Sequence, residues 1–493
     1  MHEFFLKARP LKGSASIENL RHLRLKACVR SRVWDSELCE LVRRPTLRLE
    51  QHTPCALWLR KTISLRGLVV VLIGVGVWRF VEDLGDCWST NLAMKDRDSY
   101  VKIMADMAPA MPRAVRQSFV GSAKHVLFGT ILNGLLICIP LVLLGKYFQV
   151  GNSWVFVLSL VGIVPLAERL GFVTEQLAYF TGPTVGGLLN ATFGNATEMI
   201  ICVFALRNNM IRVVQLSLLG SILSNMLLVL GCAFLFGGFA TSKREQKFDK
   251  AAAHLNSSLL LMAVMCVLFP AALHATRTEL HLGQSELTLS RITSCVMLVA
   301  YAGYIYFQLN TPPILREEDV EVAELTESEE SQVDGWSAVF WLAVLTIFIS
   351  ILSGYIIDAI EGASEAWHIP VAFISVIILP IVGNAAEHMS AIIFAVRDNL
   401  DLSLAVAIGS STQISMLVIP VCVILGWPMG VNMDLNFELF ETAVLFISVL
   451  VVAFMLLEGT ANYFKGVMLV LCYFVVGASF FVHVDPPVQV DNL

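Results

Sequence analysis

A succession of long apolar segments restricts the fold of this chain more than any other feature of its sequence. A helix that crosses the hydrocarbon core of a bilayer needs about 20 mostly apolar residues. Eleven windows fit that description: 126–146, 152–170, 177–206, 213–237, 252–273, 288–308, 338–358, 367–396, 402–426, 439–458 and 464–483. The third and the eighth are long and are interrupted by Gly and Pro. We therefore expect a polytopic membrane protein with eleven transmembrane helices.

The composition agrees with a chain embedded in a membrane. Of its 493 residues, 56% are hydrophobic and only 15% are charged, whereas soluble domains carry about 25% charged residues. This excludes an ordinary cytosolic enzyme and a disordered protein. The apolar segments do not alternate with a period of two, which argues against a β-barrel. The predicted fold class is an all-α membrane bundle in a lipid bilayer.

Charge is distributed unevenly along the chain. Residues 1–124 are basic, and the rest of the chain has more acidic than basic residues, which suggests a cationic cargo and no binding of nucleic acid. The basic segment contains one apolar run, 67–78, that is too short to cross a membrane. The segment could be a targeting peptide, a regulatory tail or an alternative start, and we favour a cytosolic tail.

A second polar segment separates the sixth and seventh windows. Residues 316–334 carry nine acidic side chains and one basic side chain, and like charges at this density repel one another and stay solvated. We expect an acidic linker, 311–335, that either only joins two halves or also collects cations weakly. The Lys and Arg bias of the short loops predicts a cytosolic N-terminus and linker, with the C-terminal tail, 486–493, on the opposite, lumenal side.

The sequence contains an internal repeat. Residues 194–198, Gly-Asn-Ala-Thr-Glu, return at 383–387 as Gly-Asn-Ala-Ala-Glu, and similar landmarks follow each copy at nearly equal spacing. We therefore predict a first, non-repeat helix at 125–150 and two five-helix repeats at 151–310 and 336–485. Because five is odd, the second repeat must enter the membrane in the opposite direction, and inverted repeats are typical of secondary transporters.

The repeated motif places Glu198 and Glu387 inside apolar spans. An ionisable residue there is costly and marks a functional site, since a merely structural role would have to arise twice at equivalent positions. Asn195 and Asn384 lie three residues earlier, so on a continuous helix each amide would point to the same side as its glutamate. Carboxylate and amide oxygens suit Ca²⁺ or Mn²⁺, and we predict a metal-binding and proton-binding site formed by the two glutamates.

More polar residues follow in the next two spans, again three positions apart. They are Ser221 and Ser224 in the first repeat, and Ser410 and Gln413 in the second. They could complete the ligand shell directly or through water, or they could form ordinary interhelical hydrogen bonds. His388, beside Glu387, could tune protonation near neutral pH or pack as a neutral core residue.

The charges of the two glutamates suggest a mechanism. Two carboxylates neutralise one divalent cation, and after it leaves, two bare charges in a low dielectric favour the uptake of protons. A site that holds either metal or protons is that of an antiporter. A Na⁺-coupled exchanger is the nearest alternative, although the repeat motifs offer no third carboxylate. A cation channel is less favoured because the repeats are inverted, and an intramembrane enzyme is rejected because the spans contain no nucleophile–base pair and no HExxH motif.

At these residues the sequence resembles the calcium/cation antiporter superfamily, and specifically the vacuolar-type cation/proton exchangers of plants. The stretches that carry the resemblance lie at 182–200, 213–234, 358–396, 401–416, 433–447 and 463–476. The resemblance implies eleven spans, proton-driven export of cytosolic Ca²⁺ into an acidic vacuole, and a multi-pass protein of the vacuolar membrane. Glu198 and Glu387 match the transport glutamates of the family, and Asn195 and Asn384 match the adjacent polar positions.

One cysteine offers a hint about selectivity among divalent cations. Cys232 follows Asn225 by seven residues and lies on about the same helix face, so its soft sulfur could favour Mn²⁺ or Cd²⁺ over Ca²⁺. The alternative is a packed thiol. We expect no cofactor, only transported cations and protons as ligands, and the sequence gives no indication of the oligomeric state.

Overall fold

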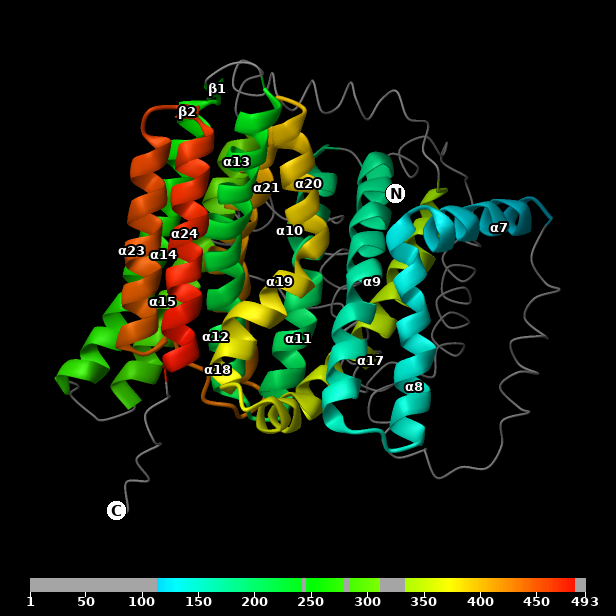
Figure 1. Cartoon of the computed structure of the whole chain (residues 1–493), viewed down its shortest axis with the longest axis horizontal. Coiled ribbons are helices and arrows are strands. Elements are labelled where there is room, and N and C mark those ends of the chain that lie inside the picture. The colour runs from blue at the N-terminus through cyan, green and yellow to red at the C-terminus, as the bar shows by residue number, and fades with distance from the viewer. Residues whose placement is uncertain (1–112, 182, 242–244, 279–283, 311–332, 484–493) are drawn as a thin grey trace, which may run out of the picture. The chain divides into compact units, whose positions relative to one another are not determined.

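The computed structural model describes residues 113–181, 183–241, 245–278, 284–310 and 333–483 of the chain (Figure 1). Three of the predicted segments lie wholly or mostly outside these residues: the basic tail, the acidic linker and the C-terminal tail. The predictions made for those three segments therefore remain predictions.

The described residues are almost entirely helical. In chain order the elements are α7 (Arg113–Phe128), η2 (Ile131–Ile137), α8 (Cys138–Tyr147), α9 (Asn152–Thr181), α10 (Pro183–Phe193), α11 (Ala196–Arg207), α12 (Ile211–Leu223), η3 (Ser224–Val229), α13 (Leu230–Ala240), β1 (Gln246–Lys247), α14 (Lys250–Thr276), α15 (Gln284–Asn310), α17 (Gly335–Trp367), α18 (Val371–Phe373), η5 (Ile374–Ile378), α19 (Leu379–Gly383), α20 (Ala385–Val396), α21 (Leu400–Gln413), η6 (Ile414–Val418), α22 (Ile419–Gly426), α23 (Leu439–Leu456), β2 (Thr460–Ala461) and α24 (Tyr463–Val482). Each of the eleven apolar windows coincides with helical structure, and the predicted all-α membrane fold is confirmed.

The number of crossings depends on how the bent helices are counted. Among the described residues, eight helices are long and apolar enough to cross a bilayer, and the number rises to ten if two bent helix pairs each count as one span. In the first pair the chain turns by 86° after Phe128, so the first crossing helix begins at Ile131 and not near residue 125. The third window begins at the end of α9 and continues through α10 and α11, each of which is too short to span alone. A total of eleven crossings stays a prediction.

The first helices of the two repeats, α9 and α17, pack against each other in opposite directions. Phe180 near the end of α9 lies next to Gly335 at the start of α17. At the other end of the pair, the rings of Phe156 and Trp367 pack edge to face with their centroids 5.8 Å apart. Figure 1 shows both helices beside α8. Equivalent helices that run antiparallel are the expected result of an inverted repeat.

The centre of the bundle contains three single turns of π-helix. η3 and η6 follow α12 and α21 at equivalent positions of the two repeats, and η5 precedes α19. π-Helical turns inside α-helices are often found at functional sites. Gly220 allows α12 to lie directly on η5, because a methyl group at this position would overlap the carbonyl oxygen of Val376.

Two equivalent connections lie at opposite ends of the bundle. Residues 245–249 lead into α14, and β1 within them pairs antiparallel with β2, which follows α23. Residues 427–438 lead into α23 and therefore lie at its other end. Each connection buries a phenylalanine just before the helix, Phe248 in the first and Phe437 in the second. These two side chains anchor the connections to the apolar core.

Candidate functional site

The repeated motif lies where two spans are broken. α10 ends at Phe193 and α11 begins at Ala196, while α19 ends at Gly383 and α20 begins at Ala385. The asparagine at each break has nearly the same backbone conformation, with φ −107° and ψ 25° for Asn195 and φ −103° and ψ 18° for Asn384. The second span bends by 59° at its break. The motif therefore fixes a helix N-terminus inside each repeat.

Each glutamate of the motif lies in the first turn of the helix that starts at the break, Glu198 in α11 and Glu387 in α20. The first turn of a helix has backbone N–H groups without helical partners and a partial positive charge, and both favour a carboxylate. Among the described residues, neither glutamate forms an ion pair with a basic side chain. The helix ends therefore offset only part of the negative charge that the two side chains carry when ionised.

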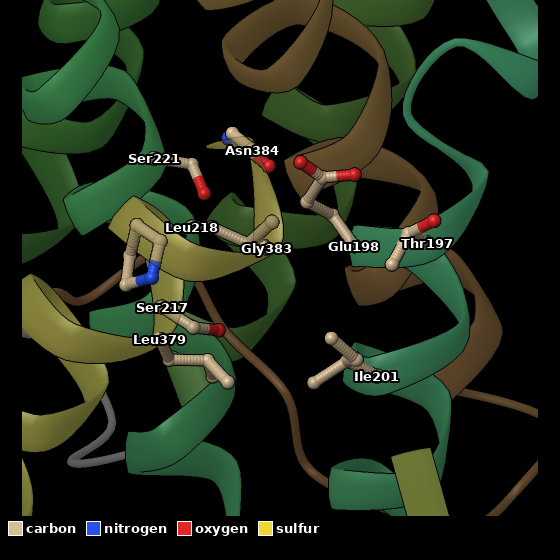
Figure 2. A pocket seen from close by; sticks show the side chains of 10 residues that line it. Thr197, Glu198, Ile201, Ser217, Leu218, Ser221, Leu379, Gly383 and Asn384 are labelled. Carbon is tan, nitrogen blue, oxygen red and sulfur yellow. The ribbon is translucent and has the colours of Figure 1, made fainter. Parts of the chain in front are cut away.

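Glu198 opens onto a small cavity. The cavity has a volume of about 20 Å³ for the centre of a water molecule, enough for one water or one dehydrated ion. Its lining residues come from both repeats: Thr197, Glu198, Ile201, Ser217, Leu218, Ser221, Leu379, Pro380, Gly383 and Asn384. Figure 2 shows the amide oxygen of Asn384 on the side facing the Glu198 carboxylate, with Ser221 beside it.

The side chain of Asn384 indicates what the cavity beside Glu198 can bind. Its side chain is buried, and its Nδ2 atom has no hydrogen-bond partner among the described residues. Two oxygens that face each other across a cavity repel unless a proton or a cation lies between them. The amide oxygen of Asn384 and the carboxylate of Glu198 are therefore suited to share one positively charged occupant.

Glu387 is held by a network centred on Ser410. The Ser410 hydroxyl lies 3.2 Å from Glu387 Oε2 and 3.2 Å from Asn195 Oδ1. It accepts a hydrogen bond from Asn225 Nδ2 at 3.2 Å, and Asn195 Nδ2 donates to Gln413 Oε1 at 2.7 Å. The residue before α11 and residues of η3, α20 and α21 are thus joined by one set of polar contacts.

Each asparagine therefore associates with the glutamate of the other repeat. The side chain of Asn195 bonds to Ser410 and Gln413 of the second repeat, whereas Asn384 lines the cavity of Glu198. The expectation that each amide points to the same side as its own glutamate assumed a continuous helix, whereas a new helix begins directly after each asparagine. Each asparagine occupies the N-cap position of a new helix with non-helical dihedral angles, and its side chain makes no capping hydrogen bond.

The other predicted site residues differ in their positions. Ser221 lines the cavity, but the Ser224 hydroxyl donates to the Ser221 carbonyl of its own helix at 3.1 Å. His388 lies beside Glu387 on α20, and its Nε2 is buried without a hydrogen-bond partner among the described residues. Cys232 is half-buried on α13 and does not line the cavity.

Three residues of the site were not predicted from the sequence. Asn225 donates to Ser410, and Thr197 and Ser217 line the cavity. Asn225 could have been found, because a buried amide in an apolar span is as exceptional as a buried hydroxyl. Ser217 lies four residues, about one helical turn, before Ser221. The two side chains therefore lie on the same side of α12, and Ser217 could have been selected on that ground.

Chemically, the site provides two carboxylates with amide and hydroxyl oxygens. Glu198 and Glu387 lie close enough for their charges to interact, and two unneutralised charges in a low dielectric are strongly unfavourable. The described part of the chain contains no group of three or more His, Cys, Asp or Glu placed to hold a metal ion. A divalent cation bound here would therefore be held by the two glutamates together with neutral oxygens.

Sequence comparison finds the same division into two halves. The sodium/calcium exchanger protein family matches residues 151–310 and 337–482. Vacuolar cation/proton exchanger 2 of Oryza sativa subsp. japonica is 64% identical over 370 residues, which cover 74% of this chain and 84% of that protein. Vacuolar cation/proton exchanger 2 of Arabidopsis thaliana is 61% identical over 380 residues, which cover 76% and 86%.

Solved structures show the same fold. Native YfkE superposes with a TM-score of 0.61 at 32% identity, covering 72% of this chain and all of that one. The selenium-substituted form is described as a Ca²⁺/H⁺ antiporter protein and has a TM-score of 0.59. The H⁺/Ca²⁺ exchanger CAX has a TM-score of 0.50 at 14% identity and supports the fold alone.

Proposed function

Because this chain belongs to the sodium/calcium exchanger protein family, we propose that it is a secondary active antiporter that exchanges Ca²⁺ for protons. The observation that carries the proposal is the meeting of Glu198 and Glu387 at two broken helices, within a cavity and network built from both repeats. A carboxylate pair of this kind can bind one divalent cation or take up protons, and it cannot stay bare in a low dielectric.

In the proposed cycle, metal and protons compete for one site. Ca²⁺ binds between the carboxylates, with Asn384 and Ser221 as further oxygen ligands, and leaves when the site opens to the acidic side. Protons then neutralise Glu198 and Glu387, and the neutral site returns to the cytosolic side. Because the site is occupied by either metal or protons in every transition between the two sides, the two fluxes are coupled by alternating access.

The membrane and the direction of transport follow from the relatives and the charge bias of the loops. The relatives named above are called vacuolar cation/proton exchangers, and we propose that this protein moves cytosolic Ca²⁺ into the vacuole in exchange for lumenal protons. The positive-inside rule supports a cytosolic N-terminus and acidic linker and a lumenal C-terminus. In this orientation the connection at residues 245–249 faces the cytosol and the 427–438 connection faces the lumen.

Hard oxygen ligands suit Ca²⁺ and also accommodate Mn²⁺. The position of Cys232 on α13, away from the cavity-lining residues, gives no support to its proposed part in selecting softer metals. We propose that the cation preference depends on the oxygens of the site and that the transport cycle needs no cofactor.

The proposal can be tested by pH-gradient-driven uptake of ⁴⁵Ca into vesicles that contain the purified protein. Glu198→Gln and Glu387→Gln are each expected to abolish uptake, because one remaining carboxylate cannot neutralise a divalent cation. Neutralising Glu327, Glu329 and Glu330 of the linker should only weaken it. Normal uptake by either single variant contradicts the proposed site, and uptake driven by a Na⁺ gradient at constant pH identifies a Na⁺-coupled exchanger instead.

A further inference from the structure

Two free cysteines from opposite repeats meet inside the bundle. Cys202 belongs to α11 and Cys422 to α22, and these two helices pack against each other. Both side chains are buried, and the Cys202 thiol lies within hydrogen-bond distance of the Cys422 thiol. The bundle therefore contains a pair of thiols that the proposed transport cycle does not use.

The thiol pair lies next to the cavity beside Glu198. Cys202 follows Glu198 by four residues, so the two side chains leave α11 on the same side, one turn apart. The Cys202 thiol is also within hydrogen-bond distance of the Ser217 side chain, and Ser217 lines the cavity. Figure 2 shows Ser217 and Ile201, the neighbour of Cys202, below Glu198 in that view. A cation that reaches Glu198 is therefore close to the thiols.

Two thiols have the ligand chemistry of a soft divalent cation. Thiolate sulfur prefers soft metals such as Cd²⁺ to the hard Ca²⁺ ion. Two thiolates neutralise one divalent cation, so the complex carries no net charge and can stay buried, whereas a monovalent cation would leave one negative charge in a low dielectric. Binding breaks two S–H bonds, forms two S–Cd bonds and releases two protons to water.

The oxygen ligands around the pair are few. The Ser217 hydroxyl donates to the Val214 carbonyl at 3.1 Å, so its oxygen keeps lone pairs for a bound cation. Hydroxyl oxygen is a weak neutral ligand, and the two sulfurs dominate the site. Such a site discriminates by softness, whereas Glu198 and Glu387 offer hard oxygens to Ca²⁺.

We propose that Cys202 and Cys422 form an inhibitory site for soft divalent cations, of which Cd²⁺ is the probe. The inference rests on the proposed function, because the cation reaches the thiols through the transport cavity. Neither cysteine lines that cavity, so a cation held by them lies outside the path of Ca²⁺ and protons. The bridge joins α11 to α22 and restrains the helix that carries Glu198. Soft cations should therefore slow transport without competing for the Ca²⁺ site.

A third buried cysteine provides a matched control. Cys266 lies on α14 and is buried like the other two, and α14 contributes no residue to the cavity. One thiol supplies only one of the two negative charges that a divalent cation requires. Differences between Cys266→Ser and Cys202→Ser therefore measure the thiol pair and not the loss of a buried sulfur.

Binding of Cd²⁺ to the purified full-length protein in detergent tests the site without transport. The protein is kept reduced with a phosphine, excess Ca²⁺ occupies the oxygen ligands, and Cd²⁺ is titrated while the ultraviolet absorbance of cadmium–thiolate bonds is recorded. The wild type and Cys266→Ser should each bind one more Cd²⁺ per chain than Cys202→Ser or Cys422→Ser. Equal binding by the wild type and by both pair variants overturns the proposal. Uptake of ⁴⁵Ca without Cd²⁺ verifies that each variant is folded.

Inhibition of transport is the second readout. After incubation with Cd²⁺, the maximal rate of ⁴⁵Ca uptake by the wild type should fall several-fold, and a dithiol chelator, but not added Ca²⁺, should restore it. In Cys202→Ser and Cys422→Ser, the Cd²⁺ concentration that halves uptake should rise by about 10- to 100-fold. Inhibition that Ca²⁺ fully relieves, or that is equally strong in the wild type and both variants, overturns the inhibitory role. If the wild type transports no Ca²⁺ at all, the proposed function fails, but the absorbance data still decide whether the thiol pair binds Cd²⁺.

Discussion

Glu198 and Glu387 occupy the same place in the same motif, yet their surroundings differ. Glu198 faces a cavity opposite Asn384, with room for a small occupant. Glu387 is bonded to Ser410, which also contacts Asn195 and Asn225. The comparison indicates a division of tasks, in which the first repeat exposes its carboxylate to the arriving ion and the second repeat holds its carboxylate in place.

The difference arises one helical turn further along the neighbouring spans. Gln413 is long enough to reach Asn195 across the repeats, whereas its counterpart Ser224 reaches only the backbone of its own helix. Asn225 donates to Ser410, whereas its counterpart Ile414 has no polar side-chain atom. Two substitutions between equivalent positions thus convert a symmetric motif into an asymmetric site.

Among the substitutions that change no charge, removal of the Asn384 amide opposite Glu198 should have the largest effect on Ca²⁺ affinity. Asn384→Ala deletes an oxygen that faces Glu198, and the half-saturating Ca²⁺ concentration should rise by about 10- to 100-fold. Uptake of ⁴⁵Ca at varied free Ca²⁺ measures this. An unchanged value would show that Asn384 is not a ligand. It would also contradict the view that Glu198 faces the arriving ion together with Asn384.

Weakening the hydrogen-bond network that holds Glu387 should have an intermediate effect on Ca²⁺ affinity. Gln413→Ala removes the 2.7 Å contact to Asn195, and the Ca²⁺ affinity is expected to fall by roughly 5- to 13-fold, because one hydrogen bond is worth about 1–1.5 kcal/mol. Ser224→Ala is the matched control at the equivalent position and should change it by less than twofold. Equal effects of the two variants would remove the asymmetry between the repeats.

The smallest effect is expected at Cys232. Cys232→Ala should leave the ratio of Mn²⁺ to Ca²⁺ uptake within twofold of the wild type, because the residue does not line the cavity. A competition assay with both cations measures the ratio. A clear change would restore the softer-metal hypothesis and would require the site to extend along α13.

The sequence was sufficient to predict most of the fold, for a specific physical reason. A bilayer requires long apolar helices, so each of the eleven windows coincides with helical structure, and the odd number of spans per repeat predicted the opposed directions of α9 and α17. The bend of 86° before Ile131 was not predicted, although Gly129 lies at the bend and a methyl group there would overlap the carbonyl oxygen of His125.

The candidate site was predicted in its residues but not in its connections. Glu198 and Glu387 stood out because carboxylates are rare in apolar spans. The crossed association of Asn195 with Ser410 and of Asn384 with Glu198 could not be derived, since it depends on where each helix is interrupted.

The size of the cavity beside Glu198 has a consequence for ion selection. A space that admits a single water molecule cannot admit a hydrated cation, so an ion must lose most of its water before it reaches the carboxylate. Mg²⁺ sheds water reluctantly, whereas Ca²⁺ does so readily. Rejection of Mg²⁺ would then be a matter of dehydration and not of ionic radius, and millimolar Mg²⁺ should leave ⁴⁵Ca uptake almost unchanged.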